Sequence, residues 1–203
     1  MANIRITPHN LDIFSDWISS CPERFREKLQ DILNYPPGSP DGAKAYKYSD
    51  MGSCEEDIPG SRDTQQKQEA EKAHENKRIA AAWGKYAEAM AAQYLLKQGL
   101  PLREWDWSPG PNSKGEIDLI SQKGDTIIFV EVKARCGKHD DPWEAIDTKK
   151  IRRLCRGANI YLQRQNEFFK YQFDVALLTG SYDDFVFEYI EDAFLCPPTS
   201  RGH

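Results

Sequence analysis

Three ionisable residues lie inside two short apolar segments that are close together in the chain. The stretch GEIDLISQKGDTIIFVEVKAR, residues 115–135, has two apolar runs around a Gly-Asp turn. Asp118 lies in the first run, and Glu131 and Lys133 lie in the second. A charged group inside a half-buried strand opposes folding unless a partner compensates it. These residues are therefore candidates for a functional site.

The alternation of side chains along a strand decides which of these groups can meet. Over 126–135 one face is wholly apolar, and the other changes from apolar to charged halfway and carries Glu131 and Lys133. Two of the expected hairpin registers pair Asp118 with Phe129 or with Glu131, which puts both carboxylates on one face. An intermediate register puts them on opposite faces, and the sequence leaves both arrangements open.

Two carboxylates and a lysine at one strand end suit a hard divalent cation. Mg²⁺, or Mn²⁺ in its place, prefers oxygen ligands and keeps waters that a substrate can displace. The cation would offset the repulsion between Asp118 and Glu131, polarise a phosphoryl oxygen and acidify a bound water. Lys133 could orient that water or stabilise the developing charge. The pattern predicts phosphodiester hydrolysis.

A run of cationic residues without acids is a second chemical signal. On a helix, most of its side chains fall opposite the apolar stripe. The candidates for contact with nucleic acid are Lys149, Arg152, Arg153, Arg156 and Arg164. Such a face can bind phosphates although the chain has a net charge of −5, because net charge hides the distribution of charge. An ordinary solvated helix face has the same pattern, so the two interpretations are equal.

Composition argues against a membrane protein and against cysteine-based sites. There is no apolar run near the ~20 residues of a membrane span, and the N-terminus lacks the features of a signal peptide. We therefore expect a cytoplasmic protein. The five cysteines are widely spaced with no C-x-x-C pair, which indicates neither a disulfide framework nor a zinc site. Cys155 is expected to be a core residue of its helix.

The elements that position these residues follow from hydrophobic periodicity and helix signals. A helix is expected to begin after Ser20, followed by a linker over 36–72 whose Pro, Gly, Ser and charge predict disorder. A second helix should run from near His74 to about Gln98. A third should begin with Asp141 as its N-cap and continue to about Gln165. The expected strands lie at about 102–108, 116–122, 126–135, 171–179 and 185–190.

This order predicts one α/β domain, residues 75–203, behind an N-terminal extension, residues 1–74, of short helices and a flexible linker. Three further side chains are expected to be structural. Trp105 and Trp107 are more often packing residues than platforms for nucleic-acid bases, and Asp174 is expected to support the strand ends.

Six sequence blocks, in the same order, resemble the YraN family of small bacterial proteins. They are GKYAEAMAAQYLLKQG, GEIDLI, FVEVKAR, KKIRRLCRGANIYL, FDVALL and IEDAF, which together cover roughly residues 77–197. That family is similar to archaeal Holliday-junction resolvases within the restriction-endonuclease-like PD-(D/E)XK superfamily. The resemblance implies an α-β-β-β-α-β core with a mixed sheet flanked by helices, and a nuclease role that is itself inferred from this kinship.

The resemblance also implies roles for individual residues. It matches Asp118 and Glu131 to the metal-binding acids, Lys133 to the catalytic lysine, Glu88 to a helix carboxylate that completes the metal ligands, and the Val132 carbonyl to a further ligand. The proline of the superfamily motif is replaced by Ile117, as in the YraN group. The alternative for Glu88 is a surface pair with Lys85, but its other helical neighbours are mostly small residues suited to close packing, which favours a site role.

We therefore expect a metal-dependent DNA endonuclease, with branched or structured DNA as one candidate substrate. One alternative is a nucleic-acid-binding module of the same fold without cleavage, and another is a partner-docking protein that acts through its N-terminal extension. The intact set of two acids and a lysine favours the enzyme, because a decayed enzyme is free to lose one of them. The expected partners are DNA, an unidentified protein for the extension, and a second copy of the chain as one candidate assembly.

Overall fold

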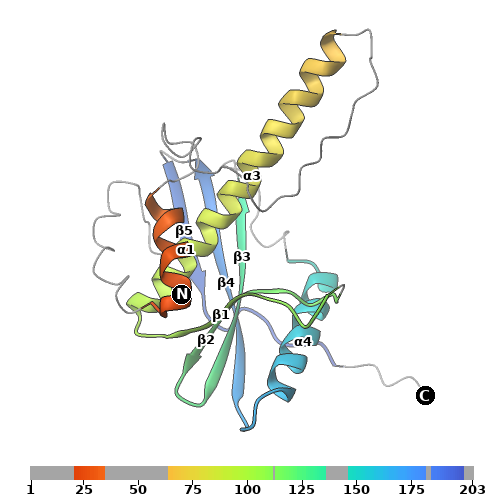
Figure 1. Cartoon of the computed structure of the whole chain (residues 1–203). Coiled ribbons are helices and arrows are strands. Elements are labelled where there is room, and N and C mark those ends of the chain that lie inside the picture. The colour runs from red at the N-terminus through yellow and green to blue at the C-terminus, as the bar shows by residue number, and fades with distance from the viewer. Residues whose placement is uncertain (1–20, 35–63, 112, 136–145, 182–183, 199–203) are drawn as a thin grey trace, which may run out of the picture.

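The computed structural model describes residues 21–34, 64–111, 113–135, 146–181 and 184–198. Within these ranges the chain forms three helices and five strands (Figure 1). In order, they are α1 (Glu23–Asn34), α3 (Thr64–Lys97), β1 (Leu102–Trp107), β2 (Ile117–Lys123), β3 (Thr126–Arg135), α4 (Thr148–Gln163), β4 (Lys170–Ser181) and β5 (Asp184–Ile190). The expected α/β class and element order are confirmed, and every expected strand is present.

The strands form one mixed sheet in the order β1-β2-β3-β4-β5. The pairs β1–β2, β2–β3 and β4–β5 are antiparallel, whereas β3 and β4 are parallel. A parallel pair needs a crossover connection, because a tight turn cannot return the chain to the same end of the sheet. The connection that contains α4 provides this crossover, so α4 lies directly after the strand that carries Glu131 and Lys133.

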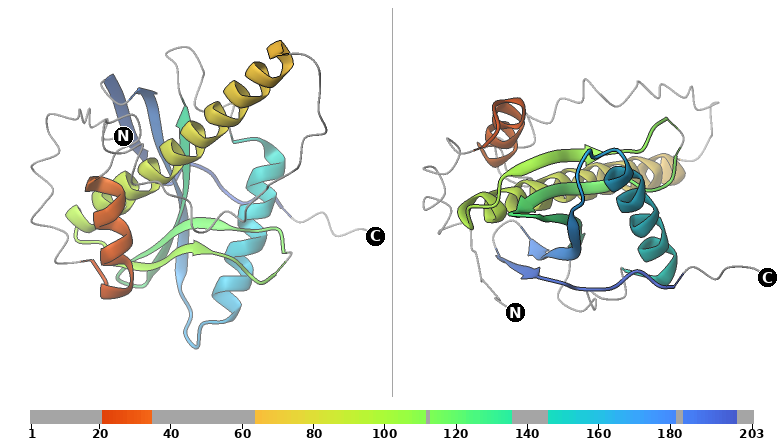
Figure 2. Two further views of the ribbon diagram at one scale, coloured as in Figure 1. Left: turned by 45° about the horizontal axis from the view of Figure 1, so that its top comes forward. Right: turned by 90° about the horizontal axis from the view of Figure 1, so that it is seen from below.

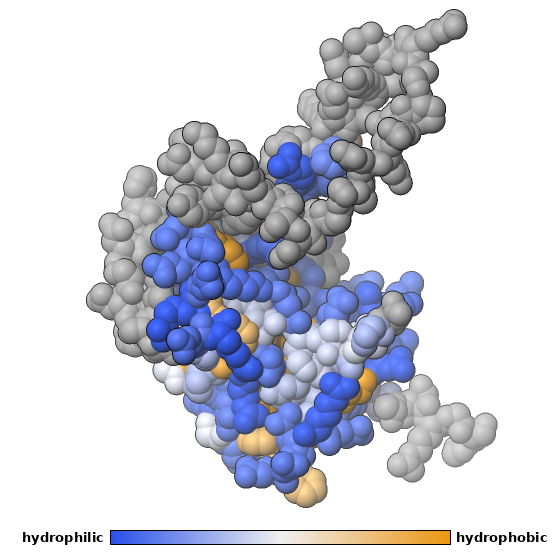
Figure 3. Space-filling view, viewed as in Figure 1, coloured by the Kyte–Doolittle hydropathy of each residue, from blue (hydrophilic) through white to orange (hydrophobic). Residues whose placement is uncertain are grey.

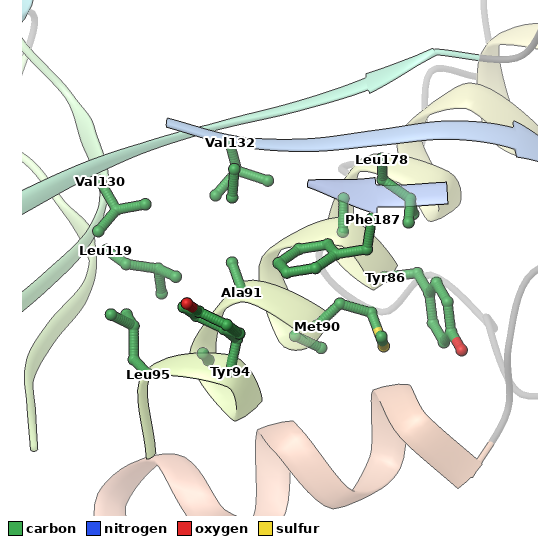
Figure 4. Packing of buried hydrophobic residues seen from close by; sticks show 14 of the residues in the cluster. Tyr86, Met90, Ala91, Tyr94, Leu95, Leu119, Val130, Val132, Leu178 and Phe187 are labelled. Atoms are coloured by element: carbon green, nitrogen blue, oxygen red, sulfur yellow. The ribbon is translucent and has the colours of Figure 1, made fainter. Parts of the chain in front are cut away.

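The two faces of the sheet are covered by different helices (Figures 1 and 2). On one face, α3 packs Leu95 beside Leu119 and Val130 (Figure 4), and its Tyr86 ring meets the Phe185 ring edge-on, with the centroids 6.1 Å apart. On the other face, α4 packs an apolar stripe against residues of β2, β3 and β4. Since β3 is covered on both sides, a charged side chain on it is buried unless it lies near the strand end.

Helix α1 belongs to the same core as α3, although it lies in the expected N-terminal extension. Cys21, Leu29 and Ile32 are buried in the cluster that α3 forms with the sheet. Lys28 adds a contact at 2.5 Å between its Nζ and Asp106 Oδ2. The boundary at residues 74 and 75 stays a prediction, but α1 is packed on the domain. Residues 1–20 and 35–63, with most of the expected linker, lie outside the described residues.

Two helix starts were predicted wrongly. Helix α3 begins at Thr64 rather than near His74, so its first turns fall in the expected linker and extend past the sheet (Figure 1). Helix α4 begins at Thr148, because Asp147 is its N-cap and accepts a hydrogen bond from the Lys150 main-chain nitrogen at 2.6 Å. Asp141 lies outside the described residues, and the non-helical residues 146–147 exclude one continuous helix from it.

The expectation of no disulfide was also wrong. Cys155 of α4 is buried in its helix face, as expected, but it forms a disulfide with Cys196, which follows β5. The two residues are 41 positions apart, and their Cα atoms are separated by 5.8 Å. Only the fold brings such distant cysteines together, so their spacing in the sequence gives no signal.

The described surface is dominated by polar and charged side chains in the view of Figure 3. None of the helices in the described part of the chain combines the length and apolar character required to span a bilayer.

Candidate functional site

The two strand carboxylates meet where β2 separates from β3. The last paired residues are Leu119 and Val130, so the register places Asp118 opposite Glu131. This is one of the two registers expected to put both carboxylates on one face, and it excludes the intermediate one. Beyond the last pair the ladder stops, and Asp118 Oδ2 instead accepts a hydrogen bond from the Val132 main-chain nitrogen at 2.7 Å.

The carboxyl group of Asp118 titrates far from its ordinary range. Burial is the main cause, and repulsion by the Glu131 carboxylate adds to it, so that its pKa rises to about 7. The Val132 N–H and the Lys150 ammonium group act in the opposite direction, and Glu88 raises the pKa slightly further. Two acids that repel each other in a poorly hydrated place are an unfavourable arrangement for folding alone. Such an arrangement is typical of functional sites.

Glu131 is the most buried charged group of the site, with 1% of its side chain exposed. One oxygen, Oε1, pairs with the ammonium groups of Lys133 and Lys150, the second at 2.8 Å. The other oxygen, Oε2, is buried and has no hydrogen-bond partner among the described residues. A buried carboxylate oxygen without a donor is costly, and in a native structure it is a sign of an absent ligand or water.

Lys150 is a site residue that was not singled out in the sequence. It belongs to the cationic run, but its ammonium group reaches across from α4 to Glu131 instead of joining the outer face. A signal for this was available in the helical spacing. Leu154, Gly157 and Ala158 follow Lys150 at intervals of four, seven and eight residues and are buried on the sheet-facing side of α4.

Glu88 lies at the margin of this group. Its Oε2 accepts a hydrogen bond from the Trp105 indole nitrogen at 2.9 Å. Burial and the nearby Asp106 raise its pKa, and the indole hydrogen bond opposes that shift. The described residues contain no group of three or more His, Cys, Asp or Glu side chains arranged to hold a metal ion. The site as described is thus a carboxylate pair with two lysines, and Glu88 is turned to Trp105.

The remaining oxygen donor comes from the main chain of β3. In a strand, the N–H and C=O of one residue point to the same side. Because the Val132 N–H points to Asp118, its carbonyl also points to that side of the strand. Asp118, the unpartnered oxygen of Glu131 and this carbonyl form a set of hard oxygen donors, which fits Mg²⁺ or Mn²⁺ with water as the remaining ligands.

The loop before β2 and helix α4 are in direct backbone contact. A Cβ atom placed on Gly157 would lie 2.2 Å from the carbonyl oxygen of Gly115, which no side chain can occupy. Gly115 itself has φ +141°, a conformation that residues with a side chain rarely adopt. These two glycines therefore fix the distance between the strand that carries Asp118 and the helix that carries Lys150.

The five candidate nucleic-acid contacts are all exposed on α4 or at its end, but they do not form one group: Lys149, Arg152, Arg153, Arg156 and Arg164. Arg153 lines a pocket of about 220 Å³ beside Lys150. Arg164 instead donates to the Pro109 carbonyl at 2.6 Å and lies over the Trp107 ring at 5.7 Å. The structure thus separates one cation beside the carboxylates from one at the far end of the helix.

Asp174 has a complete set of structural partners. Its carboxylate accepts hydrogen bonds from the Tyr189 hydroxyl at 2.8 Å, from Gln172 Nε2 at 2.9 Å and from the Asp192 main-chain nitrogen at 2.9 Å. These bonds join β4 to the end of β5 and the turn after it. The geometry agrees with the expected structural role.

Known proteins are similar in sequence to the region of this chain that carries the site residues. The sequence pattern of "Uncharacterised protein family UPF0102" matches residues 87–178. A UPF0102 protein of Phocaeicola vulgatus is 34% identical over 116 residues, which cover 57% of this chain and 93% of that protein. This chain belongs to the UPF0102 family. The UPF0102 protein of Chromohalobacter salexigens is 38% identical over 108 residues, which cover 53% of this chain and 85% of that protein. The UPF0102 protein of Stutzerimonas stutzeri is 36% identical over 117 residues, which cover 55% of this chain and 92% of that protein.

UPF0102 is the YraN family, so the resemblance noted in the sequence is confirmed. The matched region extends from the C-terminal half of α3 to most of β4. It contains the carboxylate pair, both lysines and the two contacting glycines. Helix α1 lies outside the matched residues, although Leu29 and Ile32 are buried in the same core cluster as α3.

Proposed function

We propose that this UPF0102 protein is a metal-dependent endonuclease that hydrolyses phosphodiester bonds in DNA. The observation that carries the proposal is the state of Glu131: it is buried, one oxygen pairs with two lysines and the other has no partner. Fold stability alone does not explain such a group opposite a second, half-buried carboxylate. A divalent cation explains both acids, because it neutralises their repulsion and takes up the free oxygen.

In this proposal Asp118, Glu131 Oε2 and the Val132 carbonyl hold Mg²⁺ or Mn²⁺. When bound, the cation supplies Lewis acidity toward a phosphoryl oxygen and lowers the pKa of a bound water. Glu88 accepts the Trp105 indole hydrogen bond through Oε2, so Oε1 is the oxygen that it could offer to the cation. Its expected role as a metal ligand stays a prediction.

In the proposal, Lys133 and Lys150 both position the Glu131 carboxylate, and Lys133 also contacts the substrate. Lys133 and Lys150 hold Glu131 Oε1, so that its other oxygen keeps a fixed direction. Lys133 is partly exposed at the strand end and is within reach of a bound phosphodiester group. Its ammonium group can donate to the phosphoryl oxygen on which negative charge develops in the transition state. The substrate would be DNA in the cytoplasm, and branched DNA is one candidate form of it.

The experiment is a cleavage assay over linear, nicked, flapped and four-way DNA, with Mg²⁺ or Mn²⁺, for wild type, Glu131→Gln and Lys133→Ala. We expect the two variants to lose at least about 100-fold in rate, since members of such a unit are not independently dispensable. Asp125→Asn is the control, because Asp125 lies in the turn at the other end of the same hairpin and pairs with Lys170. Full activity in Glu131→Gln would overturn the proposal.

Metal binding has a readout that does not require turnover. If Mg²⁺ binds with a dissociation constant on the order of 1 mM, about 10 mM of it adds roughly 1.4 kcal/mol to the stability of wild type. Asp118→Asn should lose this gain, and Asp125→Asn should keep it. A protein that binds DNA, does not cleave it and shows no Mg²⁺ response is instead the non-catalytic binding module.

A further inference from the structure

A polar pocket lies between the loop that precedes β2 and helix α4. It has a volume of about 220 Å³ and is lined by Ser113, Lys114, Gly115, Glu116, Lys150 and Arg153. Three of these side chains are cationic and one is anionic, so the lining carries a net positive charge. Lys150 is shared with the carboxylate site, since its ammonium group contacts Glu131 at 2.8 Å. The pocket is therefore adjacent to the proposed reaction centre.

Two cationic side chains of this pocket, Lys114 and Arg153, are not ion-paired within the described residues. Lys114 is exposed and forms no ion pair or hydrogen bond with another described residue. Arg153 donates through Nε to the Lys149 carbonyl at 3.4 Å, and its terminal nitrogens have no partner in the described ranges. Lys114 and Arg153 lie on opposite walls of a small pocket and are not ion-paired in the part of the chain that the structure describes, an arrangement suited to a phosphate oxyanion.

A larger pocket, of about 510 Å³, lies near the C-terminal end of α4 and contrasts with this one. Its arginines are engaged within the protein. Arg24 pairs with Glu104 at 3.5 Å, Arg103 donates to Gln165 at 3.3 Å, and Arg164 donates to the Pro109 carbonyl. Arg24 is paired with a carboxylate, and Arg103 and Arg164 each use a donor on a neutral oxygen of the protein, so fewer donors are left there for an anion. The smaller pocket, whose Lys114 has no such partner among the described residues, is therefore the better anion site despite its size.

The contact between Gly115 and Gly157 fixes the two walls of the smaller pocket relative to each other. Gly115 is one of the lining residues, and it touches α4 one helical turn beyond Arg153. This contact fixes the loop that carries Lys114 against the helix that carries Arg153. The backbone of both pocket walls is thus part of the packed structure.

We propose that this pocket binds a backbone phosphate of the DNA strand, with Lys114 and Arg153 as its charged contacts. Lys150 links that phosphate to Glu131 and sets the position of the strand relative to the carboxylate pair. This inference rests on the proposed nuclease function and specifies which side of the protein the DNA strand follows. It also divides the exposed arginines of α4, because Arg153 lines the pocket and Arg156 is not among its lining residues.

The test is DNA binding by full-length protein, measured by fluorescence anisotropy of a labelled four-way junction at several KCl concentrations, with EDTA present to prevent cleavage. Lys114→Gln and Arg153→Gln should each weaken binding by about fivefold at moderate salt and reduce the salt slope by about one. Arg156→Gln is the matched control on the same helix and should change neither quantity. Glu116→Gln should tighten binding, because it removes the single negative charge of the pocket.

The outcomes separate this inference from the proposed function. If wild type cleaves DNA while Lys114→Gln and Arg153→Gln bind as wild type does, the pocket is not a phosphate site and the nuclease proposal stands. If Arg156→Gln loses as much affinity as Arg153→Gln, the helix face attracts DNA diffusely and the pocket assignment is wrong. If wild type neither binds nor cleaves DNA, both proposals fail together.

Discussion

At the scale of residues, the two carboxylate oxygens of Glu131 differ in their hydrogen-bond partners. Both lysines approach Oε1, and Oε2 is left buried without a described partner. A structural ion pair would distribute its donors over both oxygens to offset the cost of burial. The Asp118 carboxylate is also incompletely compensated, because one of its oxygens accepts a hydrogen bond from the Val132 N–H while the Glu131 carboxylate repels it.

The raised pKa of Asp118 predicts how stability depends on pH without metal. Its folded value, about 7, lies above the ordinary value of 3.8, so the folded state binds more protons between about pH 4 and pH 7. Stability should therefore fall as pH rises through this range. Asp118→Asn removes this contribution, and the variant should be at least as stable as wild type near pH 8.

The measurement is the melting temperature in EDTA from pH 5 to pH 8. Asp125→Asn is the control, because Asp125 lies in the exposed turn of the hairpin and its pKa is lowered by Lys170. It should keep the slope of wild type over this range. A variant Asp118→Asn that follows wild type at every pH, or that collapses near pH 8, would show that Asp118 is an ordinary structural group.

Lys150 is expected to matter more than its neighbour in the same cationic run. Lys150→Met leaves buried Glu131 with one lysine instead of two, which we expect to cost about 1–2 kcal/mol in stability and to reduce cleavage. Lys149→Met is the matched control, because Lys149 is exposed on α4. Chemical denaturation and the cleavage assay measure the two effects. Equal behaviour of the two variants would remove Lys150 from the site.

At the scale of elements, the structure shows what sequence periodicity can and cannot supply. The period of two placed Glu131 and Lys133 on one face correctly, because alternation is a local property of a strand. It did not choose the register, which is set by the two-residue turn between the paired residues Lys123 and Thr126. The start of α4 was predicted wrongly because both Asp141 and Asp147 are good capping residues, and tertiary packing of the chain decides between them.

The contact between the β2 loop and α4 gives a prediction at this scale. Gly157→Ala places a methyl group where the Gly115 carbonyl lies, so the helix must move away from the loop. We expect a loss of about 2–3 kcal/mol in stability, because extra volume in a close-packed contact forces backbone shifts. Activity should fall as well, since Lys150 moves together with the helix.

Gly84→Ala is the matched control for this change, because Gly84 also lies within a helix and a Cβ there would meet nothing within 4 Å. Alanine is the better helix former, so Gly84→Ala should be neutral or stabilising by up to about 1 kcal/mol. Thermal denaturation compares the two variants. If Gly157→Ala is tolerated as well as Gly84→Ala, the backbone contact does not set the position of α4.

At the scale of the whole molecule, two features lie outside residues 87–178, which the family pattern matches, and could not be predicted locally. Helix α1 buries Leu29 and Ile32 in the main core, although the chain between α1 and α3 has the composition of a linker. Only the complementary surface of α3 and β1 makes this helix part of the domain. The segment after β5 is likewise held to α4 by Cys196, through a pairing that sequence separation conceals.

That disulfide leads to a prediction about the whole domain. A bond between cysteines 41 positions apart restricts the unfolded chain, which in the loop-entropy description adds up to about 4 kcal/mol to stability. Cys196→Ser should therefore lower the free energy of unfolding under oxidising conditions. With a thiol reductant present, wild type and variant should unfold at nearly the same denaturant concentration. Thiols are mostly reduced in the cytoplasm, where the proposal places this protein, so the proposed function is to be tested on the reduced form.

The reduced protein should keep its DNA cleavage, because the carboxylate pair and both lysines are held by β2, β3 and α4 through contacts that do not involve Cys196. Cys21→Ser is a comparison variant, since Cys21 is a buried free thiol and has no part in the bond. Its effect should be the same with and without reductant. If reduction of wild type abolishes cleavage while the domain stays folded, the segment after β5 positions α4 for the reaction, and the site is less independent than its contacts indicate.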